Sequence, residues 1–192
     1  MIPKSIETKK IILDIGCGKN KTKGAIGIDR IHLEGVDLVY DITKAAHPLK
    51  SEIGDKIICD NLLEHIRDII PVMEELHRIL KPKGILIINS PHGKTLRYLG
   101  DPTHVTPITC STMNYFLPDY PYNFYTKARF KILKIDLVKI PRLEHSGITQ
   151  NLYRIIWNSF IVFLWNKRLW QMEKILCVLG FNFSIEFKLA KA

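Results

Sequence analysis

The feature that most constrains the fold is an apolar run with one acid that ends in Gly-Cys-Gly, residues 11–18. Such a run predicts a strand buried on both faces of a parallel sheet, followed by a tight turn. Gly16 and Gly18 let the main chain of that turn approach a ligand, where a Cβ would obstruct it. A second apolar run, residues 25–28, leads into Asp29 and predicts a neighbouring strand. The carboxylate at its end offers two acceptors for the hydroxyls of a ribose.

Two nucleoside-binding designs share this outline. The dinucleotide fingerprint G-x-G-x-x-G needs a third glycine where this chain has Lys21, and its acid lies about 20 residues further on. Asp29 arrives much sooner. The sequence therefore disfavours a nicotinamide or flavin enzyme.

Residues 13–18 resemble motif I of the class I S-adenosylmethionine (SAM) methyltransferases. Three later segments match in order: residues 39–42 resemble the third-strand motif, 61–66 the segment after the fourth strand, and 80–88 the turn and fifth strand. The resemblance implies SAM as cofactor. The cofactor-binding residues that it implies are Asp14, Gly16, Cys17, Gly18, Asp29, Asp41, Asn61 and Leu62.

The predicted fold is one α/β domain over residues 1–192, with a doubly wound, seven-stranded, mostly parallel, Rossmann-like methyltransferase sheet. Five apolar runs predict its parallel strands at residues 11–15, 25–28, 38–40, 57–59 and 85–88. Apolar positions at helical spacing predict a helix before the fifth strand, stopped by Pro82 and Gly84; they are Val72, Met73, Leu76, Ile79 and Leu80.

Two alternating segments near the end of the chain predict the antiparallel pair that closes the sheet. They are residues 129–140 and 181–189. In the first, the alternation slips near residues 132–133 and again near 137–138, which predicts β-bulges at both places.

The chain departs from the resemblance in two places. Only eight residues separate Gly18 from Gly27, whereas a helical crossover takes a dozen or more. The first crossover helix is therefore expected to be shortened to a turn or lost. Residues 19–23 would form an exposed basic loop, and another segment or a partner chain would cover the methionine end of the cofactor. Lys83 stands where relatives often carry glycine, an exchange that a turn tolerates when φ is negative.

Two segments after the fifth strand are placed to meet a substrate, because ligands bind beyond the carboxyl ends of such strands. They are residues 90–93 and 100–104. We predict His104, oriented by Asp101, as a general base for a hydroxyl acceptor, with His92 as a second candidate. The alternative is a structural turn, since Asp-Pro starts turns and Thr103 or His104 can cap a helix.

The remaining histidines carry weaker signals. His65 is expected to pack under the sheet or to cap a turn, and the others have no informative spacing. No cluster shows the spacing of metal ligands, so the sequence predicts no metal site.

The net charge of +9 leaves the partner open. Basic groups at residues 9–23 and 127–134 would attract a polyanion or an anionic membrane. No aromatic-interleaved RNA motif accompanies them, so a solvated basic surface is favoured over nucleic-acid binding. The four cysteines are scattered without a CxxC pair, and the N-terminus lacks the apolar core of a signal peptide. Both features favour a reduced, cytoplasmic protein.

An apolar helical insertion is predicted at about residues 148–179, between the last two strands. Its part at residues 151–170 has almost no polar face, yet its longest apolar run is far shorter than the about 20 residues that span a bilayer. The alternatives are a core helix, a lid over an apolar substrate, a homodimer interface and peripheral membrane contact.

The resulting hypothesis is methyl transfer from SAM to a hydroxyl of a small molecule or of a sugar, including a lipid-linked sugar. The sugar rests on the resemblance, because related sequences are associated with surface-glycan synthesis. The alternatives are a nucleic-acid methyltransferase and a non-catalytic SAM-binding partner subunit.

Overall fold

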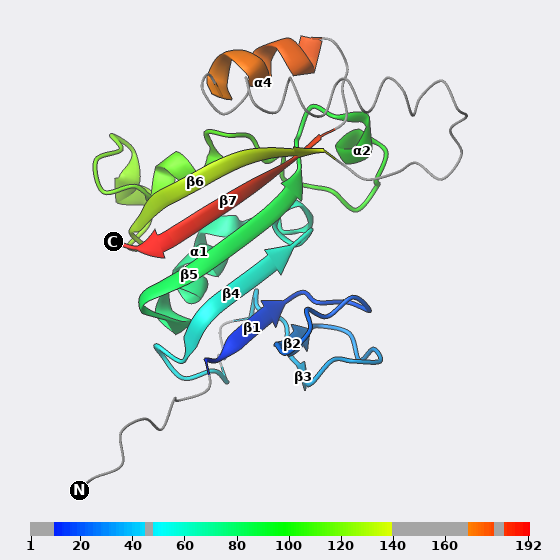
Figure 1. The fold of residues 1–192 in the computed structure, drawn as a ribbon, viewed down its shortest axis with the longest axis vertical. Helices are drawn as coiled ribbons and strands as arrows, with labels where there is room; N and C mark the ends of the chain where they lie inside the picture. The colour runs from blue at the N-terminus through cyan, green and yellow to red at the C-terminus, as the bar shows by residue number, and fades with distance from the viewer. Residues whose placement is uncertain (1–9, 45–47, 140–168, 179–182) are drawn as a thin grey trace, which may run out of the picture.

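The computed structural model describes residues 10–44, 48–139, 169–178 and 183–192, and these build a seven-stranded sheet in the order β3-β2-β1-β4-β5-β7-β6 (Figure 1). Strands β1 to β5 pair in parallel, and β7 runs antiparallel to both β5 and β6. The predicted seven-stranded, mostly parallel sheet is therefore confirmed. The strands are β1 (Ile12–Ile15), β2 (Ile26–Asp29), β3 (Leu38–Val39), β4 (Gly54–Asp60), β5 (Leu80–Pro91), β6 (Phe130–Lys139) and β7 (Phe183–Lys191).

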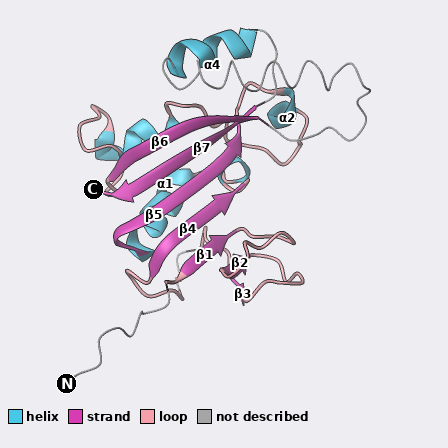
Figure 2. Cartoon of the chain, in the orientation of Figure 1, coloured by secondary structure: helices cyan, strands magenta, loops and turns pink. Residues whose placement is uncertain are grey.

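The helical elements are few. They are α1 (Ile69–Ile79), α2 (Leu96–Leu99), α4 (Leu169–Val178) and the 3-10 turns η1 (Leu63–His65), η2 (Thr112–Phe116) and η3 (Asn123–Tyr125). Figure 2 shows α1 behind the strands and α4 beyond the β6 side of the sheet. No helix in the described parts of the chain is long and apolar enough to cross a bilayer.

The predicted shortened crossover is confirmed. Residues 16–25, between β1 and β2, contain turns and no helix. Within this loop Lys21 is not free: its Nζ lies 2.9 Å from Asp37 Oδ2, and the same oxygen accepts from the main-chain N of Gly27 at 2.7 Å. These bonds from Lys21 and Gly27 hold the pKa of Asp37 below its usual range. The basic loop is thus fastened to the edge of the sheet.

Asp68 caps the N-terminus of helix α1, and its side chain accepts from the main-chain N of Ile70 at 3.2 Å. Its apolar face, which includes Val72 and Leu76, is buried against the sheet. The helix ends at Ile79, and Leu80 already belongs to β5. The predicted helix was therefore one residue too long, and it stops before Pro82 is reached.

Lys83 corrects another expectation. Its φ is +65°, in the left-handed region that favours glycine. The assumption of a negative φ at this position was wrong, so lysine in place of glycine costs the turn some stability.

The register between β6 and β7 shows which of the two predicted β-bulges is present. The register shifts between Ile132 and Lys134, which confirms the first. Leu137 and Val138 pair in regular register with Ile185 and Ser184, so the second prediction was wrong. The side chains of these two neighbouring residues point to opposite faces of the sheet, so Leu137 is buried and Val138 is exposed.

The apolar insertion is seen only in part. Helix α4 lies between β6 and β7 in the chain, within the predicted range. Residues 140–168 and 179–182 lie outside the described residues, and with them most of the 151–170 segment. Its proposed roles as core helix, lid, dimer interface or membrane contact stay predictions.

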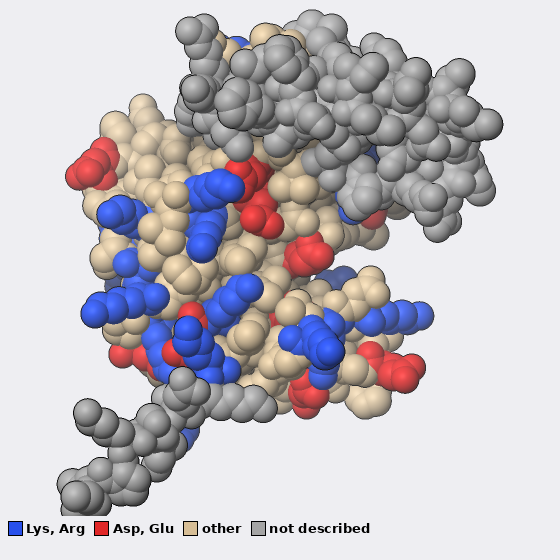
Figure 3. Space-filling view, viewed as in Figure 1, with Lys and Arg blue, Asp and Glu red and all other residues tan. Residues whose placement is uncertain are grey.

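Charges on the face seen in Figure 3 are mixed. Lys and Arg side chains are spread over its described part, with Asp and Glu side chains between them. Among the described residues, Lys134 Nζ in β6 lies 2.8 Å from Asp136 Oδ2. On this face the described basic groups form no continuous positive tract.

Candidate functional site

A cavity of about 370 Å³ lies beyond the carboxyl ends of β1, β2, β3 and β4. Ligands of doubly wound sheets bind at this edge, and pockets for small molecules have volumes of about 300–1,000 Å³. The lining residues are Ile15, Gly16, Gly18, Asp29, Arg30, Ile31, Leu33, Tyr40, Asp41, Ile42, Thr43, Asn61, Leu62, His65, Ile66 and Thr103.

The turn after β1 forms one wall of the cavity. Gly16 and Gly18 have φ values of +72° and +52°, which glycine adopts at little cost. A Cβ on Gly16 would lie 2.8 Å from Leu62 Cδ1, whereas one on Gly18 would meet nothing within 4 Å. The main chain therefore lies against Leu62 at the first glycine and next to open space at the second.

The side chain of Asp29, at the end of β2, holds the main chain of this turn in place. Its Oδ2 accepts from the main-chain N of Gly18 at 2.9 Å, and its Oδ1 accepts from Ile31 N at 3.0 Å. A carboxylate has about four lone-pair sites. Each oxygen of Asp29 thus retains acceptor capacity at the cavity that the residue lines.

Asp41 lies farther along the same cavity. Its Oδ1 accepts from the main-chain N of Thr43 at 3.0 Å and from Thr43 Oγ1 at 2.7 Å. Burial pushes the pKa of Asp41 upward, but the bonds from Thr43 and the nearby Lys44 and Arg30 bring it below its usual value. The side chain is therefore ionised at neutral pH.

Asn61 and Leu62 complete the adjoining wall. Asn61 has a φ of +51°, and its main-chain N donates to the carbonyl oxygen of Asn89 at 2.9 Å. Its side-chain Nδ2 donates to Asp60 Oδ1 at 3.1 Å. A left-handed residue held by these bonds is a common feature of ligand sites, because the surrounding structure compensates for the strain.

Two of the predicted cofactor residues do not line the cavity. Asp14 is buried, and its Oδ2 accepts from the main-chain N of Thr22 at 2.6 Å. It therefore steadies the loop after β1. Cys17 is packed behind the turn, and burial raises the pKa of its thiol.

His65 corrects the expectation that it packs under the sheet or caps a turn, because it lines the cavity. Its Nδ1 lies 3.0 Å from Thr103 Oγ1, and that hydroxyl donates to Asp101 Oδ1 at 2.6 Å. Burial, and next the neighbouring His104, lower the pKa of His65. The residue ends η1, the turn that follows β4, and its place in the segment after a strand end was the signal that could have identified it.

His104 lies behind His65 and is not itself a lining residue. The two ring centroids are 4.7 Å apart, and His104 Nδ1 donates to the carbonyl oxygen of Tyr98 at 2.8 Å. Its Nε2 is 3.7 Å from Asp101 Oδ2. Residues 101–104 form a turn, as the structural alternative predicted, and the same turn brings Asp101 and His104 beside His65.

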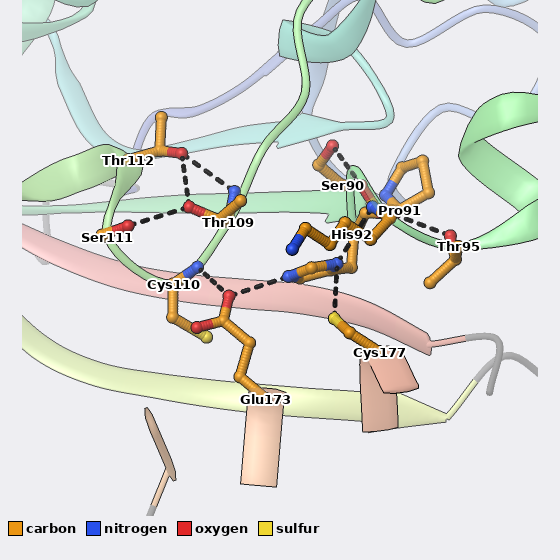
Figure 4. A network of polar contacts seen from close by, with 11 residues as sticks. Ser90, Pro91, His92, Thr95, Thr109, Cys110, Ser111, Thr112, Glu173 and Cys177 are labelled. Atoms are coloured by element: carbon orange, nitrogen blue, oxygen red, sulfur yellow. Dashed lines mark hydrogen bonds and ion pairs between the residues drawn. The ribbon is translucent and has the colours of Figure 1, made fainter. Parts of the chain in front are cut away.

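His92 lies elsewhere. It is 1% exposed and does not line the cavity. Its Nε2 is 2.8 Å from Glu173 Oε1 in α4, an oxygen that also accepts from the main-chain N of Cys110 at 2.9 Å (Figure 4). Its Nδ1 accepts from Lys94 N at 3.2 Å. Nε2 thus binds α4 and Nδ1 binds the loop after β5, so both ring nitrogens are engaged and this placement gives no support to His92 as a base.

Other lining residues were not predicted from the sequence. They follow strand ends, the position that generally faces a ligand in this architecture, but their side-chain types carried no signal of their own. They include Arg30, Ile31 and Leu33 after β2 and Thr43 after β3, whereas Thr103 lies in the 100–104 segment that was expected to meet a substrate.

Solved structures share the fold. A SAM-dependent methyltransferase from Archaeoglobus fulgidus aligns with a TM-score of 0.61 at 20% identity, over 95% of this chain and 86% of that one. Phosphoethanolamine N-methyltransferase 2 from Haemonchus contortus, in complex with SAM, aligns with a TM-score of 0.53 at 16% identity, over 98% of this chain and 50% of that one.

Curated relatives match more locally. Ubiquinone biosynthesis O-methyltransferase from Xylella fastidiosa (strain M23) is 28% identical over 100 residues, 41% of each chain. The protein of the same name from Histophilus somni is 30% identical over 108 residues, 43% of this chain and 45% of that one. The match thus spans less than half of the length of these relatives.

The family described as "Methyltransferase domain" matches residues 1–119, more than half of the chain. This match covers the five parallel strands and every residue that lines the cavity. The chain therefore belongs to the methyltransferase domain family and is a class I, SAM-dependent methyltransferase by fold.

Proposed function

We propose that this protein transfers the methyl group of SAM to a hydroxyl of a small molecule, with a sugar or lipid-linked sugar as the acceptor class to test first. The observation that carries the proposal is the Asp29 carboxylate, fixed at the cavity by two main-chain bonds beside the glycine turn. The names of the curated relatives specify methylation of oxygen, which supports a hydroxyl acceptor.

The cavity residues fit the cofactor. Asp29 would accept from the ribose hydroxyls, and Asp41 would face the adenine edge. Asn61 and Leu62 would border the adenosine. The open space beside Gly18 supports close approach of a ligand to the main chain at that point. Asp14 and Cys17 would act only by supporting the turn.

SAM supplies a methyl group on a positively charged sulfur, which is already an activated leaving group. The chain must hold the acceptor hydroxyl in line, exclude water and handle the hydroxyl proton. His65 is the histidine that lines the cavity, so we assign the position facing the acceptor to His65 and Thr103. Asp101 and His104 would stand behind them, a modification of the predicted role of His104 as the base.

The nucleic-acid alternative has less support. Lys21, central in the basic loop, is paired with Asp37, which reduces the charge that the loop presents to a phosphate backbone. The described part of the chain offers no observation that favours the non-catalytic alternative.

The test has two stages. Isothermal titration with SAM and with its demethylated product, S-adenosylhomocysteine, should show binding to the purified protein. Failure to bind either compound would end the proposal. Release of S-adenosylhomocysteine is then measured with phenols, nucleotide sugars, lipid-linked sugars and RNA at low and high salt. Methylation of RNA that falls steeply with salt would favour the nucleic-acid alternative, and O-methylation of a sugar, read by mass spectrometry, would support the proposed acceptor.

A further inference from the structure

Glu64 is an unusual residue in the wall behind the cavity. Its side chain is fully buried beside Ser90, and neither carboxylate oxygen has a hydrogen bond of normal geometry among the described residues. A buried carboxylate without partners is costly, and native proteins normally pair it or use it to bind an ion. Burial raises the pKa of this carboxyl, and a cation bound beside it would compensate for the cost of its charge.

Two histidines lie beside this carboxylate. One oxygen of Glu64 and one imidazole nitrogen each of His65 and His104 all lie within 4.8 Å of one another. Neither histidine donates a hydrogen bond to Glu64, since both of its oxygens lack a partner. The three side chains are therefore close together, but no hydrogen bond joins either histidine to Glu64.

The other nitrogen of each histidine is already engaged. Nδ1 of His104 donates to the Tyr98 carbonyl oxygen, which leaves the lone pair of the neutral ring on Nε2. The Thr103 hydroxyl donates to Asp101, so it accepts from Nδ1 of His65, and Nε2 again keeps the lone pair. Metal-binding histidines are commonly oriented in this way, through a carbonyl or a carboxylate on the second nitrogen.

We propose that Glu64, His65 and His104 bind one divalent transition-metal cation of the Zn²⁺ type. Two imidazole nitrogens and one carboxylate oxygen are a donor set that such cations prefer. Donors on one metal lie at most about 4.2 Å apart, twice the ligand distance, so binding would draw the set together by up to roughly 0.6 Å.

Three protein ligands leave a coordination position open. Because His65 lines the cavity, that position would face the acceptor, and a hydroxyl bound to the cation would lose its proton more readily. This second role rests on the proposed function, whereas the metal site itself does not.

The site is tested with tag-free protein that has been dialysed against a chelator. Zn²⁺ is titrated calorimetrically without SAM, and the retained metal is measured by mass spectrometry. We expect one bound equivalent, and a rise in melting temperature with Zn²⁺. Glu64→Gln and His104→Gln should each weaken Zn²⁺ binding by at least about tenfold and abolish that rise.

His32→Ala is the matched control, because His32 is exposed and does not line the cavity; its Zn²⁺ affinity should equal that of the wild type. Should Glu64→Gln fail to fold, His104→Gln and His65→Gln carry the test. Absence of Zn²⁺ binding by the wild type, or equal affinity in the folded variants, would overturn the proposal. Binding of S-adenosylhomocysteine, measured separately, distinguishes this failure from a failure of the proposed function.

Discussion

The carboxylate of Asp29 accepts a hydrogen bond from the main-chain N of Gly18 at 2.9 Å, which ties the end of β2 to the turn after β1. Ile31 N binds the other oxygen at 3.0 Å, so main-chain donors orient both oxygens at the cavity. A group held in this way needs little rearrangement when a ligand arrives.

Replacement of Asp29 by Ala is expected to weaken binding of S-adenosylhomocysteine by about 1.5–3 kcal/mol, because charge-assisted hydrogen bonds are lost. Isothermal titration at neutral pH measures the effect. Glu34→Ala is the control, since it removes the same charge from an exposed residue that does not line the cavity. A folded Asp29→Ala protein with unchanged affinity would refute the role of Asp29.

Gly16→Ala should destabilise the fold more than Gly35→Ala. Both glycines have positive φ, but only at Gly16 would the new Cβ meet a neighbour, Leu62 Cδ1 at 2.8 Å. We expect an extra loss of about 1–3 kcal/mol from overpacking at residue 16. Urea unfolding measures the difference, and Leu62→Ala in the Gly16→Ala background should recover part of it. Equal losses for the two glycines would contradict the packing argument.

Glu173→Gln tests the attachment of α4. Burial raises the pKa of Glu173, but its bonds with His92 and with Cys110 N outweigh this and hold it below the ordinary value of 4.5. A lowered pKa in the folded state means that the stabilisation is fully present above pH 4.5 and is lost as the pH falls through the folded value.

At pH 7 the Glu173→Gln variant should therefore be less stable by about 1 kcal/mol, the difference between charged and neutral hydrogen bonds. The difference should vanish well below the ordinary pKa of glutamate. Melting temperatures across this pH range measure it, with Lys174→Gln, an exposed change on the same helix, as control. A difference that persists at the acidic end would show that the carboxylate charge does not hold α4.

Lys83→Gly should stabilise the protein by about 0.5–1 kcal/mol. Relief of the left-handed conformation gains about 1–2 kcal/mol, from which the greater chain entropy of glycine removes about 0.5–1 kcal/mol. Lys83→Ala keeps the φ of +65° and should bring no gain. The free energies of unfolding in urea decide between them, and a destabilised Lys83→Gly protein would contradict the prediction.

The positions of the strands along the chain, the shortened crossover and the position of the cofactor edge were predictable from the sequence. A strand of a parallel sheet is buried on both faces, so it appears in the sequence as a short apolar run. Glycines or an acid then mark its end, and both signals are local. The eight residues between Gly18 and Gly27 exclude a helical crossover by length alone. The family match over residues 1–119 agrees with these local signals.

Turn conformations and bulges were only partly predictable. Nothing in the composition of the turn at Lys83 fixes the sign of φ, and the apolar pair Leu137-Val138 has the same pattern with or without a bulge. The register across β6 and β7 decides that question, and it is set by pairing between segments far apart in the chain.

The chemistry of the individual histidines was decided by the tertiary structure. Sequence pattern placed His92 and His104 after strand ends but could not show that the first is sealed against α4 and the second faces Glu64 and His65. Main-chain N atoms of Val105 and Thr106 donate to the Glu64 carbonyl oxygen at 2.8 and 3.1 Å, and these long-range bonds hold the 101–104 turn over His65. The periodicity of apolar residues predicts which side chains are buried. Contacts between residues some forty positions apart depend instead on how the loops fold over the edge of the sheet.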